Sequence, residues 1–197
     1  MQDDIKKQKN AAFTPNFGTQ RKEAKQPGPR RKSISAVTLS KLKIEPEDLV
    51  IVSNNIGRGA LGDVHLAKWN NVMVAIKQLA KIEEETLREF RKEVLLMSQL
   101  RHPNIIALLG ALWNEKIVGI VLEFAEKGSL AGVMRNPTIS KPLTWFDPLL
   151  RIVTEVAMGM NYLHTTSIHD ENTHDQVECV LHRDLKPSNV LLTSGFS

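Results

Sequence analysis

Five short apolar runs and one amphipathic stripe organise the first part of the chain after residue 48. The runs have the length and composition of strands, which we expect over 49–56, 63–69, 72–77, 105–113 and 117–124. Apolar residues also recur at three- and four-residue steps at Leu87, Phe90, Val94 and Met97. That spacing predicts a helix over 83–100 that buries one face.

Residues that favour turns lie at the boundaries of these elements. Asn70-Asn71 predicts a two-residue turn between the second and third strands, because asparagine tolerates a positive φ. A second turn is expected over 114–116. The helix is expected to end before Pro103, because a proline cannot continue it.

Helical patterns return over residues 129–164. We expect a short helix over 129–135 and a longer one over 147–164. The apolar positions that predict a broad buried face on the longer helix are Leu149, Leu150, Ile152, Val153, Val156, Met160 and Leu163. Residues 165–178 are polar and predict a surface loop. Val180–Leu181 and Val190–Leu192 then predict two buried strands around a polar loop.

Residues 1–48 differ from the rest of the chain in charge. They hold 11 of the 26 Lys and Arg residues and 6 of the 22 Asp and Glu residues, a net charge of +5, whereas residues 49–197 carry −1. Large apolar side chains are few, so burial cannot offset the entropy lost on ordering, and we expect disorder. The charge also permits binding to nucleic acid or an acidic membrane, but a solvated linker fits this composition better.

The remaining composition narrows the class of protein. A single cysteine, Cys179, excludes a disulfide framework and indicates a reducing compartment. No apolar run reaches the length of a membrane span and no signal-peptide core is present, so we expect a cytoplasmic protein. His164, His169, His174 and Cys179 recur every five residues, which fits no zinc signature. We therefore expect an exposed loop without metal rather than a metal site.

The polar loop 182–189 contains side chains that can transfer a proton and bind a metal ion. Asp184 can accept the proton of a substrate hydroxyl. Asn189 offers a neutral oxygen ligand for Mg²⁺ on nucleotide phosphates. The cation Arg183 can anchor this loop or pair with a phosphorylated segment.

Glycines follow the first predicted strand in the pattern Gly57-x-Gly59-x-x-Gly62-x-Val64. They let backbone N–H groups approach phosphate oxygens without an intervening Cβ. A dinucleotide-binding loop of this pattern opens a helix, whereas a strand is expected here, which favours a hairpin over phosphates. An ordinary glycine-rich hairpin is the alternative.

Strand alternation places Ala75 and Lys77 on one face, opposite Val74 and Ile76. A small residue beside a cation suits an adenine ring and a phosphate. Glu93 falls on or beside the apolar stripe of the predicted helix, so we expect it to form an ion pair with Lys77. The alternatives are a lysine that extends into solvent and an exposed glutamate.

The motifs occur in the order glycine loop, Val74-Ala-Ile-Lys77, helical glutamate, His102-Pro-Asn-Ile105, apolar-Glu-Phe hinge and His182-Arg-Asp-Leu-Lys-Pro-Ser-Asn189. This order resembles the eukaryotic protein kinases over about residues 49–193. The residues Leu-Lys-Pro-Ser after Asp184 resemble the Ser/Thr type. Ile44–Leu49 and Ala67–Trp69 resemble the tyrosine-kinase-like group.

The resemblance implies an α+β fold with two lobes. Residues 49–122 would form a complete N-lobe with a five-stranded antiparallel sheet and one helix. Residues 123–128 would be the hinge, and 129–197 would be the first part of a helical C-lobe. The resemblance thus divides the chain into a disordered basic tail, 1–48, and an incomplete kinase domain, 49–197.

The resemblance also implies a role for each matched residue. Lys77 would hold the α- and β-phosphates of ATP and pair with Glu93. Asp184 would be the catalytic base, Lys186 would contact the γ-phosphate, and Asn189 would bind Mg²⁺. The nucleotide-binding residues would be Ile56, Gly57, Gly59, Gly62, Val64, Ala75, Lys77, Leu122, Glu123, Ala125, Asn189 and Leu191. Leu122 would be the gatekeeper, and Met97, Leu108 and His182 would belong to the regulatory spine.

The sequence departs from the kinase pattern in two places. First, 17 residues separate His164 from His182, which is longer than the family usually shows. Second, the 197 residues contain no Asp-Phe-Gly, activation segment or Ala-Pro-Glu. We therefore expect a truncated or fragment form, and we expect that residues 1–197 alone do not transfer phosphate.

The favoured hypothesis is an ATP-dependent Ser/Thr protein kinase of signal transduction, with ATP, Mg²⁺ and protein substrates as its partners. The alternative is a non-catalytic kinase-like binding module. A nucleic-acid binder ranks last. Arg30-Arg-Lys-Ser33 also fits a site for an upstream basophilic kinase.

Overall fold

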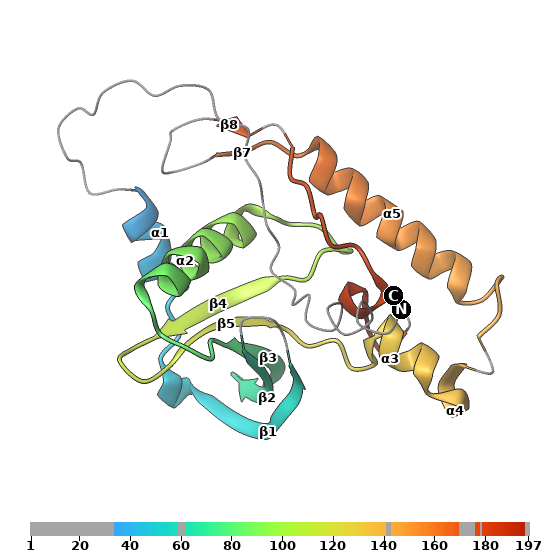
Figure 1. Cartoon of the computed structure of the whole chain (residues 1–197), viewed down its shortest axis with the longest axis horizontal. Coiled ribbons are helices and arrows are strands. Elements are labelled where there is room, and N and C mark those ends of the chain that lie inside the picture. Colours follow the sequence, from blue (N-terminus) through green and yellow to red (C-terminus); the bar gives the residue numbers. More distant parts are fainter. Residues whose placement is uncertain (1–33, 59–61, 141–142, 170–175, 178, 196–197) are drawn as a thin grey trace, which may run out of the picture.

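The computed structural model describes residues 34–58, 62–140, 143–169, 176–177 and 179–195. A five-stranded sheet, one large helix against it and a second group of helices make up this part of the chain (Figure 1). The strands of the sheet are β1 (Leu49–Arg58), β2 (Asp63–Trp69), β3 (Val72–Gln78), β4 (Leu108–Trp113) and β5 (Val118–Glu123). All neighbouring strands are antiparallel, as the kinase resemblance implies, and their order in the sheet is β1-β2-β3-β5-β4.

The two predicted turns are present. Asn70 and Asn71 have φ values of 48° and 69°, and Trp69 pairs with Val72 across the turn. At the other turn, the Asn114 side-chain oxygen accepts hydrogen bonds at 2.8 Å from the backbone N–H groups of Lys116 and Ile117. Asparagine therefore fixes the register of both hairpins.

The large helix α2 (Glu84–Gln99) agrees with the predicted helix to within one residue at each end. Its first turn is fixed by the Thr86 hydroxyl, which accepts a hydrogen bond at 3.0 Å from the Glu83 N–H. Phe90 and Val94 are buried in a core cluster with residues of the sheet, and Leu87 and Met97 pack against the same cluster. The apolar stripe read from the sequence is thus the packed face.

The fourth and fifth strands are shorter than predicted. Residues 105–107 lie outside β4, and Ile117 and Phe124 lie outside β5. The Ala107 N–H instead donates to the Glu123 carboxylate at 2.7 Å, and the Ile105 N–H donates to the His102 carbonyl at 3.0 Å. These bonds form a loop and a turn where the apolar pattern alone predicts a strand.

Further elements follow the sheet. Among them are β6 (Gly128–Ser129), α3 (Leu130–Arg135), α4 (Pro137–Ser140), α5 (Leu149–Thr165), a 3₁₀ turn η2 (Pro187–Asn189) and β9 (Leu191–Leu192). The Ser129 hydroxyl caps α3 by accepting from the Gly132 N–H at 3.1 Å. Strands β6 and β9 pair antiparallel, which ties the segment after β5 to the end of the described chain.

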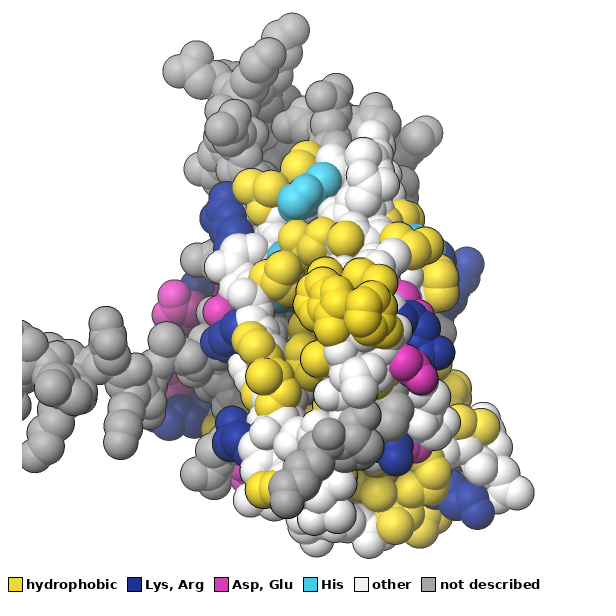
Figure 2. Space-filling model, turned by 90° about the vertical axis from the view of Figure 1, so that its right-hand side faces the viewer, with side chains coloured by type: hydrophobic (Ala, Val, Ile, Leu, Met, Phe, Trp, Pro, Cys, Tyr) yellow, Lys and Arg dark blue, Asp and Glu magenta, His cyan; other side chains and the backbone are white. Residues whose placement is uncertain are grey.

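The broad buried face predicted for α5 is only partly correct. Ile152 and Leu163 are buried, whereas Leu150 and Val153 are 42% and 53% exposed. Hydrophobic side chains accordingly cover much of the face turned to the viewer in Figure 2, on the side of the molecule where α5 lies in Figure 1. The periodicity identifies apolar positions but not which of them meet a packing partner among the described residues.

The expectation of disorder through residue 48 is wrong for residues 34–48. Helix α1 (Ile34–Leu42) and a 3₁₀ turn η1 (Pro46–Asp48) precede β1. Leu39 and Leu42 pack on the core around α2, and Ile44 is buried. These three apolar side chains therefore contribute to the packing of this segment on the sheet. Residues 1–33, including Ser33, lie outside the described residues.

The loop predicted over 165–178 contains a short hairpin. Strands β7 (Ile168–His169) and β8 (Gln176–Val177) pair antiparallel, and Ile168 is buried, because it packs with Leu163 on α5. His174 lies outside the described residues, so the expected absence of metal there stays a prediction. Among the described residues, no three His, Cys, Asp or Glu side chains are grouped to hold a metal ion. In the same part of the chain, no helix is long and apolar enough to cross a membrane.

Candidate functional site

The predicted ion pair between β3 and α2 is present. Lys77 Nζ lies 2.9 Å from Glu93 Oε1, and the two side chains are 9% and 10% exposed. Val74 and Ile76 are buried on the opposite face of β3, as strand alternation predicts. The alternation of side chains on β3 and the apolar stripe of α2 thus bring a cation and a carboxylate together between the sheet and α2.

The polar loop after α5 forms a second cluster. The Asn189 side-chain amide donates to the Asp184 carbonyl at 2.7 Å and to its carboxylate at 3.0 Å. Lys186 Nζ lies 2.8 Å from the same carboxylate. Arg183 adopts a φ of 60°, which turns the chain sharply just before Asp184. The loop is therefore organised around one acid.

The electrostatics of this cluster keep Asp184 ionised. The hydrogen bond from Lys186 lowers the pKa of Asp184 below its ordinary value, and the Asn189 hydrogen bond and the Lys186 charge act in the same direction. Burial lowers the pKa of His182, although the nearby Asp184 charge opposes this. A carboxylate that is ionised at neutral pH can accept a proton.

The strand expected before this loop is absent, which corrects the sequence prediction. Leu181 is 42% exposed and belongs to no strand. Val180 is buried instead because it packs beside Leu163, and its N–H donates to the Leu163 carbonyl of α5 at 2.9 Å. A helix end therefore anchors the loop on one side, and β9 anchors it on the other.

The glycine loop connects β1 to β2 as a hairpin. Gly57 pairs with Val64, and Val64 pairs with Lys77 on the neighbouring strand, so the loop lies next to the ion pair. Gly62 has a φ of +155°, and a Cβ there would lie 1.8 Å from the Gln78 carbonyl oxygen. A strand follows Gly62, which disagrees with a dinucleotide-binding loop. Gly59 lies outside the described residues.

The predicted gatekeeper and hinge residues lie at the end of β5 and directly after it. Ala75 lies opposite Leu122, and Val74 lies opposite Glu123, in the ladder between β3 and β5. The Glu123 carboxylate is bonded to the Ala107 N–H, so this side chain supports the hinge. Ala125 contributes its carbonyl to a turn that accepts from the Gly128 N–H at 3.0 Å.

Backbone hydrogen bonds connect the hinge to the end of the polar loop. The Lys127 N–H donates to the Leu192 carbonyl at 3.0 Å, and the Leu130 N–H donates to the Val190 carbonyl at 2.8 Å. The pairing of Ser129 with Leu191 places Leu191 beside the hinge. The predicted residues therefore form two groups, one on the sheet and α2 and one on the loop, joined through residues 127–130.

The donor set fits a magnesium nucleotide. Lys77 supplies a buried cation for phosphates, and Asn189 keeps its amide oxygen as a cation ligand, because its NH₂ group is bonded to Asp184. Of the predicted spine residues, Leu108 is buried in the core beside α2, and Met97 packs against the same core. Sequence reasoning missed the support that residues 39–44 give to this core, although the spacing of Leu39 and Leu42 is a helical signal.

Comparison with known proteins agrees with this geometry. Residues 50–196 match the family described as protein tyrosine and serine/threonine kinase. The chain is 38% identical over 159 residues, 78% of its length and 20% of the relative, to the probable serine/threonine-protein kinase drkC of Dictyostelium discoideum. It is 34% identical over 186 residues, 92% of its length and 16% of the relative, to the probable serine/threonine-protein kinase SIS8 of Arabidopsis thaliana.

A third relative comes from a virus. The chain is 35% identical over 166 residues, 83% of its length, to the putative serine/threonine-protein kinase/receptor R818 of Acanthamoeba polyphaga mimivirus, of which it covers 9%. Across these three relatives the chain spans between 9% and 20% of the relative's length. The match over residues 50–196 shows that the chain belongs to the eukaryotic-type protein kinases, and the three relatives are themselves named as Ser/Thr kinases.

Proposed function

We propose that this chain provides the ATP-binding lobe, hinge and catalytic loop of a Ser/Thr protein kinase of the tyrosine-kinase-like group. The protein would transfer the γ-phosphate of ATP to hydroxyl groups of other proteins in signal transduction. The observation that carries the proposal is the buried ion pair between Lys77 and Glu93 in a chain that also holds the Asp184–Asn189 loop. The Ser/Thr names of the relatives support the acceptor class.

Each of these residues has a defined part in phosphoryl transfer. Glu93 orients Lys77, whose ammonium group binds the α- and β-phosphates. Asp184 takes the proton of the acceptor hydroxyl as its oxygen attacks the γ-phosphorus and ADP leaves. Lys186 stabilises the negative charge of the transferred group.

Asn189 would hold Mg²⁺, which supplies charge neutralisation on the phosphates. Phosphoryl transfer by this family also uses a carboxylate as a second metal ligand, and the 197 residues contain no Asp-Phe-Gly to provide it. We therefore propose that transfer requires a segment in addition to residues 1–197. A non-catalytic binding module is the second candidate, and it is favoured for residues 1–197 alone because of this missing ligand.

Two further proposals concern the setting of the protein. Ser33 would accept phosphate from an upstream basophilic kinase, since Arg30, Arg31 and Lys32 precede it. Mass spectrometry of the protein from its own cells tests this, and complete coverage of the tail without phosphate on Ser33 would refute it.

We also propose a cytoplasmic location, and fractionation that places the protein elsewhere would refute this.

A phosphotransfer assay tests the main proposal. Residues 1–197 and the longest reading frame that contains them are each incubated with labelled ATP, Mg²⁺ and a mixture of Ser, Thr and Tyr peptides. Asp184→Asn serves as the blank and Lys92→Met as the matched control on the surface of α2. We expect label on Ser and Thr from the long form, its loss in Asp184→Asn, and none from residues 1–197. Activity of residues 1–197 above the blank would refute the need for a further segment. An inactive, folded long form would support the binding module.

A further inference from the structure

Residues 39–44, here called the strap, contact both faces of the sheet. One core cluster, on the side of α2, consists of Leu79, Phe90, Val94, Leu108, Ala111, Val118 and Ile120. The other consists of Ile44, Ala67, Val74, Ile76, Leu112 and Val121. Neighbours such as Ala111 and Leu112 point to opposite faces of a strand, so the two clusters lie on opposite faces of the sheet. Leu39 and Leu42 pack on the first cluster, and Ile44 belongs to the second.

The strap crosses the sheet at its free edge. Strand β4 is the last strand in the sheet order, and Lys43 forms a parallel bridge with Ala111. The Ile44 N–H donates to the Ala111 carbonyl at 2.8 Å. These bonds occupy backbone groups that β4 would otherwise leave unpaired.

Gly110 makes room for this crossing. A Cβ at Gly110 would lie 2.5 Å from the Ile44 side chain and 2.8 Å from the Leu42 carbonyl oxygen. Contacts of that length are not tolerated, so a side chain on β4 at this position would displace the strap. The crossing is therefore a specific fit between β4 and the strap, and not a loose covering of the edge.

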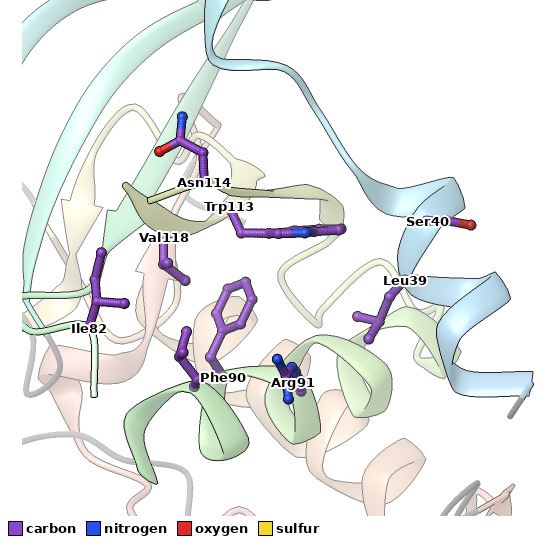
Figure 3. A pocket seen from close by; sticks show the side chains of 9 residues that line it. Leu39, Ser40, Ile82, Phe90, Arg91, Trp113, Asn114 and Val118 are labelled. Atoms are coloured by element: carbon purple, nitrogen blue, oxygen red, sulfur yellow. The ribbon is translucent and has the colours of Figure 1, made fainter. Parts of the chain in front are cut away.

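A hollow beside the strap shows how α1 meets α2. Figure 3 shows Leu39 pointing from α1 into this hollow, with Trp113 of β4 and Phe90 of α2 beside it. The hollow measures about 330 Å³ and is mostly apolar in its lining. The contact between α1 and α2 is thus incompletely filled, and α1 contributes Leu39 and Ser40 to the lining.

The two ends of the strap hold the two elements that carry the ion pair. Leu39 and Leu42 pack on the cluster that contains Phe90 and Val94, which flank Glu93 on α2. Ile44 packs on the cluster that contains Ile76, the neighbour of Lys77 on β3. A displacement of the strap would loosen α2 and β3 relative to each other at the pair.

We propose that Leu39, Leu42 and Ile44 are positioning residues that hold Glu93 against Lys77. The strap thereby sets the fraction of molecules in which Glu93 is paired with Lys77. The effect of the strap on the ion pair is argued from contacts in the structure. The effect of the strap on ATP affinity rests on the proposed function.

The test measures the exposure of Lys77 directly. The full chain is treated briefly with an amine-acylating reagent, and the rate at each lysine is read by mass spectrometry. Glu93→Gln, which removes the pair, sets the upper limit of the rate at Lys77. Leu39→Ala tests the strap, Leu39→Met is the conservative rescue, and Ile168→Ala is the control, because it removes a buried side chain from a cluster that contains no strap residue. Acylation of Lys92 normalises the rates.

We expect Leu39→Ala to raise the rate at Lys77 about 10-fold, the size of typical couplings between sites. Leu39→Met and Ile168→Ala should stay within about twofold of the unchanged chain on the same scale. If Leu39→Ala does not fold, Ile44→Val, which removes one methyl group, should raise the rate by a smaller factor. A folded Leu39→Ala with an unchanged rate, or an equal rise in Ile168→Ala, would overturn the proposal.

A separate measurement of ATP affinity distinguishes the strap from the proposed function. Faster acylation together with weaker ATP binding supports both. Faster acylation in a folded chain that binds no ATP supports the strap and refutes the nucleotide site.

Discussion

Lys77 Nζ and Glu93 Oε1 lie 2.9 Å apart, with both side chains about nine-tenths buried. A second lysine and glutamate pair, Lys92 and Glu89, has nearly the same separation, 2.8 Å, on the exposed surface of α2. The first pair is buried and joins β3 to α2, whereas the second is exposed and lies within α2. The two pairs therefore compare a pair in low dielectric with a pair in water.

Glu93→Gln should lower the free energy of unfolding by about 3 kcal/mol, because the buried Lys77 side chain would lose this carboxylate partner. Glu89→Gln should change it by less than about 0.5 kcal/mol. Denaturant titrations of the two variants measure both values. Equal effects would contradict the assignment of the Lys77 pair as the stabilising one.

The double variant Lys77→Met with Glu93→Leu separates stability from function. Replacing a buried pair with apolar side chains of similar volume is often neutral, so we expect recovery of most of the stability lost in Glu93→Gln. ATP binding should be weakened in the double variant, because Lys77 no longer supplies a cation for the phosphates. Calorimetry with ATP and Mg²⁺ gives the second result, and undiminished ATP binding by the double variant would argue against the role of Lys77.

Lys186→Met should raise the pKa of Asp184 towards its ordinary value, since the Lys186 hydrogen bond is the largest cause of the lowering. A carboxyl group with a lowered pKa stabilises the fold above the pKa of the unfolded chain, and this stabilisation is lost as pH falls through the folded value. In the variant, Asp184 should protonate at higher pH than in the unchanged chain, so its contribution to stability should also be lost at higher pH. Carbon-13 NMR of the side-chain carboxyl group measures the shift, and Lys92→Met should not change it.

Gly62→Ala should destabilise the glycine hairpin by about 1–3 kcal/mol, the cost of a strained backbone conformation. The added Cβ would lie 1.8 Å from the Gln78 carbonyl oxygen at a φ of +155°. Gly132→Ala in α3 is the matched control and should be neutral or stabilising, because alanine favours a helix. Thermal unfolding of both variants is the measurement. Similar melting temperatures would show that the hairpin accommodates a side chain.

The strands and the large helix of the N-lobe could be predicted because their periodicity is local. Alternation on β3 gives the faces of Lys77 and Ile76, and the stripe on α2 places Glu93 beside the core. The ion pair between Lys77 and Glu93 then forms once β3 and α2 pack against each other. The roles of the residues in nucleotide binding rest on the resemblance to kinases and stay predictions.

The missed features depend on contacts between distant segments. Order in residues 34–48 depends on the free edge of β4 and on the absence of a side chain at Gly110, which the composition of the segment does not show. The start of β4 depends on the Glu123 carboxylate, 16 residues away from Ala107. Leu150 and Val153 are apolar but are only partly covered by the described residues.

ATP affinity measured by calorimetry on the folded chain, with and without Mg²⁺, tests the nucleotide site most directly. The comparison is between the unchanged chain, Lys77→Met and the surface control Lys92→Met. We predict Mg²⁺-dependent binding that Lys77→Met weakens at least about 10-fold, the equivalent of about 1.4 kcal/mol, and that Lys92→Met leaves unchanged. No binding by the folded chain, or equal affinity in Lys77→Met, would contradict the account.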